Sequence, residues 1–230
     1  MLEQGLIKLG YTPEEIATMK GGLESYAKEL ELFNKAYDLV GADTYEDIII
    51  KHVLDSMAGQ KEICRLKNEI LASGVSEKDF VIADIGTGGG LPGIPLAISM
   101  PDTKFVLIER MTKRCRFLEN CIAVLGLKNV TVQCLEAERV PQQSFDMATF
   151  RAFRPLEKKM TRVLLRTLKK PHGLLAAYKA KSEKIAEEME GIKQWAPNFS
   201  IVPLSVPFLE DRERHLVIIP GAQESSTSGV

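Results

Sequence analysis

Blocks of apolar and polar positions alternate along the last two thirds of this chain. Short apolar runs predict strands at residues 80–85, 104–109, 129–134, 145–150, 173–179, 199–206 and 214–219. Amphipathic stretches predict helices at 91–100, 111–125, 155–170 and 182–195. This alternation favours an α/β fold, with a mostly parallel seven-stranded sheet covered on both faces. A short link rich in proline and charge joins the last two strands, which predicts an antiparallel hairpin at the sheet edge.

The first part of the chain has a helical pattern instead. Thr12, Pro13 and two following acids predict a helix start, and apolar residues then recur at helical intervals. A second helix is expected from Asp43 onward, with Ile49, Val53 and Met57 on one face. We therefore predict an N-terminal helical extension at 1–75, a ligand-binding α/β domain at 76–220 and a disordered tail at 221–230.

The segment at residues 80–93 predicts a ligand site. It reads Phe-Val-Ile-Ala-Asp-Ile-Gly-Thr-Gly-Gly-Gly-Leu-Pro-Gly, an apolar strand that ends in a carboxylate, a glycine-dense loop and a helix start. Glycine permits positive φ and lets a ligand approach the backbone closely. At the carboxyl end of a parallel sheet, such a loop is typical of nucleotide binding. The candidate ligand-binding residues here are Asp84, Gly86, Gly88, Gly90 and Leu91.

The glycine spacing distinguishes two kinds of nucleotide. A dinucleotide fingerprint needs a third glycine at position 91, where this chain has Leu91. Gly86, Gly88 and Gly90 instead form the G-x-G-x-G pattern of S-adenosylmethionine-dependent methyltransferases. The next predicted strand ends in Glu109, at the position where an acid accepts hydrogen bonds from ribose hydroxyls. S-adenosylmethionine is therefore the expected cofactor.

Length and composition are those of an ordinary globular protein. The chain has 230 residues, 45% hydrophobic and 27% charged, and no apolar stretch reaches the roughly 20 residues that span a bilayer. No secretion signal begins the sequence, so we expect a cytoplasmic protein without membrane contact. Four scattered cysteines and three histidines lack metal-ligand spacing, which predicts neither a metal site nor a disulfide framework.

Positive charge is concentrated in one segment. Residues 151–184 hold eleven Lys and Arg against two Asp and Glu, although the whole chain has a net charge of −1. A series at i, i+4 spacing lies on one predicted helix face: Arg154, Lys158, Arg162, Arg166 and Lys170. Like charges at this spacing repel each other, and a bound polyanion offsets that repulsion. We expect RNA to contact Arg114, Arg154, Lys158, Arg162, Arg166 and Lys179.

A wider resemblance is carried by three segments, Asp84–Ala97, Lys113–Leu118 and Arg151–Phe153, with Phe33–Lys35 and Lys51–Ser56 upstream. Together they closely resemble the bacterial RsmG type of methyltransferase, also called glucose-inhibited division protein B. The resemblance implies a Rossmann-like class I methyltransferase fold. It also implies methylation by S-adenosylmethionine of N7 on one guanine of 16S rRNA, within the small ribosomal subunit.

By the same resemblance, residues at the ends of four strands bind the cofactor. Gly86 and Leu91 contact it, Glu109 binds its ribose, Ala137 and Glu138 line the adenine side, and Arg151 closes the pocket near the methionine end. The implied partner is 16S rRNA or the small ribosomal subunit, and we expect a monomer.

The absence of an obvious general base agrees with this reaction. Guanine N7 has a lone pair and no proton, so alignment and desolvation suffice. Arg151 is the candidate positioning residue. His52, Asp55 and Ser56 lie within one helical turn, where they cannot form a hydrolase triad, so we expect them to pack or cap a helix, with RNA contact as the alternative. For Tyr178 and Trp195, core packing is expected rather than base stacking.

Three other functions are compatible with parts of the pattern. A methyltransferase for a small molecule or protein is disfavoured by the basic helix. A non-catalytic RNA-binding ribosome factor would not bind S-adenosylmethionine. An NAD-dependent oxidoreductase is disfavoured by Leu91 and by the lack of a catalytic Tyr-x-x-x-Lys pair.

Overall fold

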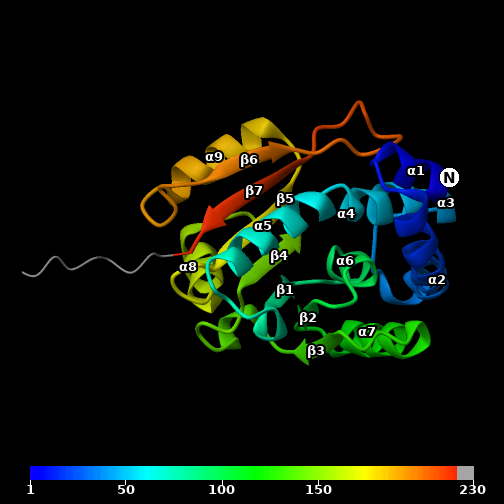
Figure 1. Cartoon of the computed structure of the whole chain (residues 1–230), viewed down its shortest axis with the longest axis horizontal. Coiled ribbons are helices and arrows are strands. Elements are labelled where there is room, and N and C mark those ends of the chain that lie inside the picture. Colours follow the sequence, from blue (N-terminus) through cyan, green and yellow to red (C-terminus); the bar gives the residue numbers. More distant parts are fainter. Residues whose placement is uncertain (222–230) are drawn as a thin grey trace, which may run out of the picture.

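Seven strands form one sheet in the computed structural model, which describes residues 1–221 (Figure 1). The strand order is β3-β2-β1-β4-β5-β7-β6, and the first five strands are parallel. This confirms the predicted α/β architecture. The strands are β1 (Val81–Ile85), β2 (Lys104–Glu109), β3 (Val130–Cys134), β4 (Met147–Arg151), β5 (Leu174–Lys179), β6 (Ser200–Pro203) and β7 (His215–Pro220).

The last two strands form the predicted antiparallel hairpin. β7 pairs with both β5 and β6 in the antiparallel sense, so β6 is the edge strand. The order of the sheet reverses between β1 and β4, because the chain adds β2 and β3 on one side of β1 and returns to the other side. Ligands bind at such a switch point, beyond the carboxyl ends of the strands.

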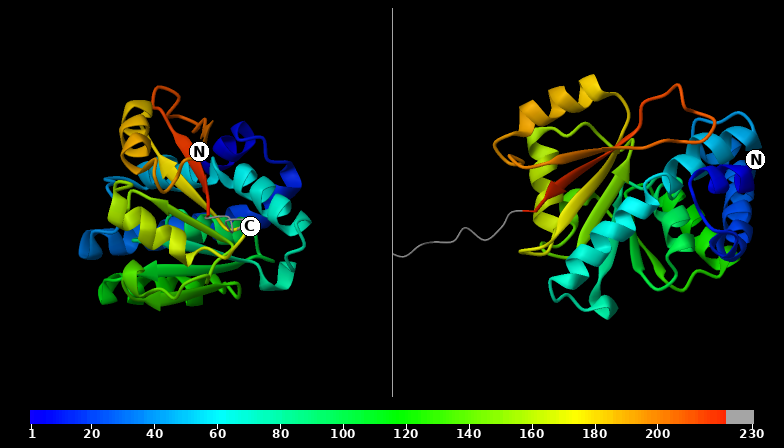
Figure 2. Two further views of the ribbon diagram at one scale, coloured as in Figure 1. Left: turned by 90° about the vertical axis from the view of Figure 1, so that its left-hand side faces the viewer. Right: turned by 45° about the horizontal axis from the view of Figure 1, so that its top comes forward.

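Helices cover both faces of the sheet, and each face has its own apolar core. One face packs against α1 (Leu2–Lys8), α2 (Pro13–Tyr37), α5 (Gln60–Ala72), α6 (Gly93–Ser99) and α7 (Thr112–Leu125). The other face packs against α8 (Lys158–Thr167), α9 (Ser182–Ile192) and the short η3 (Ala137–Arg139). Figure 2 shows the blue N-terminal helices at the opposite end of the molecule from the gold α9.

The N-terminal segment folds as its sequence pattern predicts at both expected helix starts. Thr12 and Glu15 form a capping box at the start of α2. Thr44 caps α3 (Tyr45–Ile48), which continues into the π-helical η1 (Ile49–Leu54) and α4 (Asp55–Met57). The side chains of Ile49, Val53 and Met57 are buried, as expected. The π-helical turn was not predicted, because its i, i+5 hydrogen bonds leave no distinct apolar period. The short η2 (Glu77–Asp79) then leads into β1.

The basic helix is shorter than predicted. α8 spans Lys158–Thr167 rather than 155–170, because Pro155 precedes it and Pro171 follows it closely. Arg154 and Lys170 therefore flank the helix, and only Lys158, Arg162 and Arg166 of the predicted series lie on it. Its apolar face is buried on the sheet through Met160, Leu164 and neighbouring residues.

The described chain ends at Gly221, beside the start of β5. Gly221, the first residue of the predicted tail, donates a backbone hydrogen bond to the Gly173 carbonyl, 2.7 Å. Residues 222–230 lie outside the described part. Within residues 1–221, none of the helices combines the length and apolarity needed to cross a bilayer.

Candidate active site

The glycine loop joins the end of β1 to α6, and a buried carboxylate braces it. Asp84 Oδ2 accepts hydrogen bonds from Thr87 Oγ1 at 2.6 Å and from the Gly93 backbone N–H at 2.8 Å. Gly86, Gly88 and Gly90 have φ angles of 70°, 59° and 96°. Only glycine adopts these angles without strain, so the loop can double back tightly over the strand end.

The second carboxylate oxygen of Asp84 has no partner. Oδ1 is buried, and no donor within the described chain reaches it. Burial raises the pKa of Asp84 to about 6, and the hydrogen bonds from Thr87 and Gly93 only partly offset this effect. A buried acceptor without a partner is costly, so this oxygen is suited to a ligand donor or cation.

Gly88 leaves open space beside the loop. A Cβ at this position would come no closer than 3.9 Å to any other part of the described chain, and the nearest atom is Arg114 Nη1. A Cβ on Gly90, by contrast, would collide with the Ile94 side chain, so Gly90 serves helix packing. The loop therefore presents Gly88 to the cavity.

Glu109 ends β2 beside this loop, as predicted. Its two carboxylate oxygens accept backbone hydrogen bonds from Gly88 at 3.1 Å and from Met111 at 2.8 Å. The carboxylate thereby connects the first and second strand ends. A cavity of about 230 Å³ opens here, and Glu109, Ala137 and Glu138 are among its lining residues. The structure therefore places these three predicted residues together.

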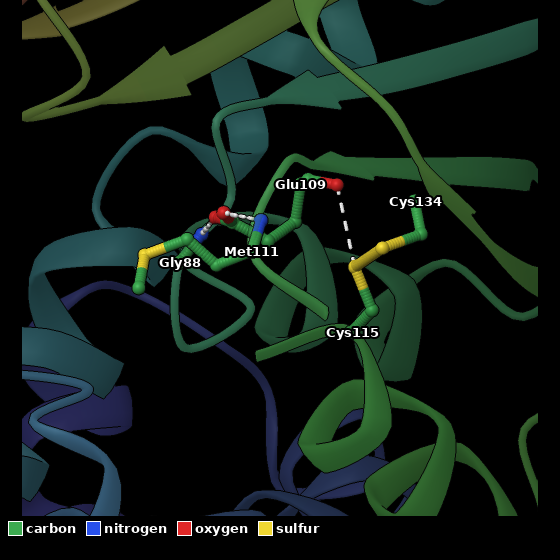
Figure 3. The surroundings of a disulfide bond; sticks show 5 residues. All are labelled: Gly88, Glu109, Met111, Cys115 and Cys134. Atoms are coloured by element: carbon green, nitrogen blue, oxygen red, sulfur yellow. Dashed lines mark hydrogen bonds between the residues drawn. A yellow bond between two sulfur atoms is a disulfide. The ribbon is translucent and has the colours of Figure 1, made fainter. Parts of the chain in front are cut away.

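A disulfide lies directly behind Glu109 (Figure 3). It joins Cys115 in the first turns of α7 to Cys134 at the end of β3, and Cys115 Sγ lies 3.3 Å from the Glu109 carbonyl oxygen. The expectation of no disulfide was wrong. The two cysteines are 19 residues apart in sequence, and they come together because β3 pairs with β2 while α7, which follows β2, packs against β3.

A larger cavity of about 750 Å³ adjoins the glycine loop. The N-terminal extension supplies one of its walls, through Leu39, Val40 and Gly41. Tyr26 on α2 also donates a hydrogen bond to the Gly89 carbonyl at 2.7 Å, which fixes the loop against the extension. The volume lies within the range of small-molecule sites.

Arg151 is held on one side of this cavity by the helix that contains His52 and Asp55. Arg151 Nη1 donates to Asp55 Oδ2 at 2.5 Å and to the Lys51 carbonyl at 3.0 Å. Asp55 Oδ1 accepts from Arg214 Nε at 2.7 Å. The expected role in helix packing is therefore incomplete, because His52 and Asp55 both also bind Arg151. The segment Lys51–Ser56 carries part of the family resemblance, but nothing in the sequence pairs Asp55 with Arg151 and Arg214, which lie 96 and 159 residues away.

His52 completes the arrangement as a neutral acceptor. Its Nδ1 lies 3.0 Å from Arg151 Nη2, and because a guanidinium only donates, Nδ1 accepts. Burial, followed by the neighbouring Arg151 charge, lowers the pKa of His52 to about 4. The third member, Ser56, donates its hydroxyl back to the His52 carbonyl, 2.7 Å, which is the expected role within a helix.

Phe153 separates the two cavities. Ala152 has a φ of 52°, a left-handed conformation that turns the chain at the end of β4. The Phe153 ring then packs so closely on Gly86 that a Cβ there would lie 2.0 Å from the ring. Both cavities are lined by Phe153 and Arg154, so the segment after Arg151 is their common wall.

The predicted RNA-contacting residues lie in two places. Arg114 and Lys179 line the large cavity, where Arg114 donates to the Asp38 carbonyl at 2.9 Å and Lys179 pairs with Glu188 at 2.5 Å. Arg154 is exposed at the rim. The others lie on α8, where Lys158 and Arg162 are exposed and Arg166 donates to the Glu138 carbonyl.

Tyr178 is buried, as expected, and its hydroxyl donates to the Ser56 carbonyl at 2.8 Å.

Comparison with known proteins agrees with this geometry. The family GidB, described as rRNA small subunit methyltransferase G, matches residues 19–217. The chain belongs to this family. It is 41% identical to ribosomal RNA small subunit methyltransferase G of Treponema denticola, over 95% of this chain and 93% of the relative. It is 34% identical to the protein of the same name from Actinobacillus pleuropneumoniae, over 95% of both chains.

Solved structures support the Rossmann-like methyltransferase fold. A human methyltransferase 10 domain containing protein matches 86% of this chain and 97% of its own, with a TM-score of 0.53 and 14% identity. The tRNA (m1A58) methyltransferase TrmI from Aquifex aeolicus matches 69% of this chain and 68% of its own, with a TM-score of 0.51 and 14% identity. Membership of the small-subunit rRNA methyltransferase G family identifies the chain as a methyltransferase, and the solved structures show its fold.

Proposed function

We propose that this protein transfers a methyl group from S-adenosylmethionine to N7 of one guanine in 16S rRNA. One observation carries the proposal: two adjoining cavities meet at the glycine loop, one built around Glu109 and the other around Arg151. Family membership supports the RNA substrate, because the relatives are named for ribosomal RNA of the small subunit. Since that RNA is made and assembled in the cytoplasm, we propose the same location for the protein.

The residues of the loop fit the cofactor. S-adenosylmethionine supplies an electrophilic methyl group on a sulfonium, and its methionine part adds an ammonium and a carboxylate. The unpartnered Oδ1 of Asp84 is an acceptor for a positive group, and Gly88 leaves open space on the cavity side of the loop. Glu109 retains acceptor capacity for ribose hydroxyls beyond its two backbone bonds. Ala137 and Glu138 line the same cavity and suit the adenine.

The arrangement of Arg151 and Arg214 around Asp55 suits a guanine that needs no deprotonation. Guanine N7 carries a lone pair and no proton, so transfer requires no general base. His52 and Asp55 are committed to Arg151 and Arg214, which makes both unsuited to proton abstraction. Arg donors bind guanine O6 well. We assign Arg151 to positioning the base through O6, and Phe153 to excluding water from the reacting atoms.

Methylation mapping tests this proposal. 16S rRNA and small subunits from a strain that lacks the gene are incubated with the protein and S-adenosylmethionine, and N7-methylguanine is located by chemical strand cleavage. We expect cleavage at one guanine that depends on both the protein and the cofactor. An unchanged pattern on both substrates, from protein that S-adenosylmethionine stabilises thermally, would contradict the RNA assignment and leave the cofactor assignment standing.

A further inference from the structure

A second groove lies along α8, apart from the two cavities of the active site. Its volume is about 800 Å³, and it shares no lining residue with either of them. One wall is the exposed side of α8, and another is the turn at Gln142 and Gln143. Trp195, just beyond the end of α9, also lines the groove. α8 and α9 lie together at the left of Figure 1.

The groove is strongly basic. Its lining includes Lys158, Lys159, Arg162, Arg166 and Lys170, and within residues 1–221 its walls contain no carboxylate. None of these five cations forms an ion pair with a carboxylate of the described chain. Five like charges kept so close together repel each other, and a polyanion that releases its counterions offsets this cost.

An aromatic ring stands among these charges. Trp195 packs against the apolar core of this face, as expected, but it is only half-buried and also lines the groove, where the Lys158 ammonium lies 5.9 Å from the centre of its ring. Apolar side chains of Val163, Leu165 and Leu168 contribute to the same lining. A groove that combines cations along the backbone path with an aromatic platform is typical of single-stranded nucleic-acid sites, where bases stack on the ring. A duplex keeps its bases stacked internally and would leave the ring unused.

The basic track begins at the active site. Arg154 lines both cavities there, and Lys158 follows four residues later at the start of α8. Arg162 and Arg166 continue along the helix, and Lys170 lies beyond its end. A strand whose target base enters the large cavity can therefore continue into the groove.

We propose that the α8 groove binds a single-stranded segment of the RNA substrate next to the target nucleotide. The α8 cations contact its phosphates, and one base stacks on Trp195. This inference rests on the proposed function, because it takes RNA as the substrate. It adds a binding surface away from the reacting atoms, which sets the affinity for RNA and leaves cofactor binding unaffected.

The single tryptophan of the chain makes the contact directly observable. The full-length protein is titrated with a 12-nucleotide single-stranded oligoadenylate and with a duplex of equal length, while Trp195 fluorescence is recorded. We expect quenching by the single strand alone, with an affinity that falls steeply as salt rises. Equal affinity for the duplex, or binding that leaves the fluorescence unchanged, would overturn the proposal.

Charge-matched variants distinguish RNA binding in the groove from a general attraction between the protein's positive charge and RNA. The double variant Lys158→Glu with Arg162→Glu changes the groove, whereas Lys128→Glu with Lys184→Glu makes the same charge change at exposed positions elsewhere. With labelled oligoadenylate, we expect at least a tenfold weaker affinity in the groove variant and a much smaller change in the control. Trp195→Leu should weaken binding about tenfold at unchanged charge.

Methylation of 16S rRNA by the same variants distinguishes the two proposals. We expect the groove variant to show a raised KM for RNA, with kcat and thermal stabilisation by S-adenosylmethionine as in the control. If the wild-type protein methylates rRNA and the groove variant has the KM of the control, the groove proposal fails and the function stands. If the wild-type protein methylates nothing while groove binding persists, the proposed function fails alone.

Discussion

Asp55 and Arg151 are 96 residues apart in sequence and 2.5 Å apart in the structure. Asp55 belongs to the N-terminal helices, and Arg151 is the last residue of β4. The same carboxylate also binds Arg214, so it is a buried anion between two cations. The N-terminal extension therefore lines the candidate active site, and through Asp55 it holds the arginine that we propose for the guanine.

Removing the charge of Asp55 tests this arrangement. Asp55→Asn keeps the shape but leaves two largely buried arginines without their anion, so we expect Arg151 to move and kcat for rRNA methylation to fall about 100-fold. Melting temperature should fall as well. Asp47→Asn is the matched control, because Asp47 forms an ion pair with Lys51 near the surface of the same segment. Near-normal kcat in Asp55→Asn would show that Arg151 needs no such support.

Gly88→Ala tests whether the open space beside the loop belongs to the cofactor. Gly88 and Gly126 have similar φ angles of 59° and 65°, and neither Cβ would meet a close neighbour in the described chain. Each alanine variant should therefore lose about 1 kcal/mol of folding stability from backbone strain. Only Gly88→Ala should weaken S-adenosylmethionine binding, by at least tenfold in calorimetry. Equal affinities in the two variants would place the cofactor elsewhere.

The raised pKa of Asp84 predicts that cofactor affinity depends on pH. Because its pKa is about 6 in the folded protein, Asp84 is mostly ionised at pH 7.5 and mostly protonated at pH 5. S-adenosylmethionine carries a net positive charge, so its affinity should rise with pH through this range. Calorimetric titrations at pH 5, 6 and 7.5 measure the effect. Asp84→Asn retains the oxygen that accepts from Thr87 and Gly93, and its affinity should change much less with pH.

The raised pKa of Asp84 also makes folding stability depend on pH, and here the effect runs the other way: stability falls as pH rises. A carboxyl group whose pKa is higher in the folded state than its ordinary value of 3.8 binds more protons when folded. The contribution of Asp84 to stability is therefore greatest below that ordinary value and is lost as pH rises through about 6. In chemical denaturation without cofactor, Asp84→Asn should gain stability relative to the wild type at pH 7.5 and little at pH 4. A variant less stable at pH 7.5 would contradict this sign.

The disulfide can be detected and removed chemically. Alkylation under denaturing, non-reducing conditions should modify two cysteines, Cys64 and Cys121, and reduction should raise the number to four. Because the bond closes a loop of about 20 residues, reduction should lower the unfolding free energy by about 3 kcal/mol. Cys64→Ser should leave that difference unchanged. Four alkylated cysteines before reduction would show that the bond does not form in the purified protein.

Local sequence patterns were sufficient to predict the strands, most of the helices and the part of the candidate site around the glycine loop and Glu109. Apolar runs predicted all seven strands. The signal is strongest for β1, β4 and β5, because parallel strands that are buried on both faces are apolar along most of their length. The glycine spacing and Glu109 predicted the loop and its neighbouring acid, since both lie at strand ends whose positions follow from the topology. Helix ends were less accurate: the charge series extends from Arg154 to Lys170, whereas α8 spans only Lys158–Thr167, between Pro155 and Pro171.

The sequence by itself determined the fold class, the family and the glycine loop, because these depend on residues that are close along the chain. Only the tertiary structure brought Asp55 to Arg151 and Arg214, joined Cys115 to Cys134 and placed Trp195 beside the α8 cations. Each of these contacts links separate elements of the fold. Such contacts depend on how the helices pack on the sheet, and the composition and periodicity of one segment contain no information about its distant neighbours.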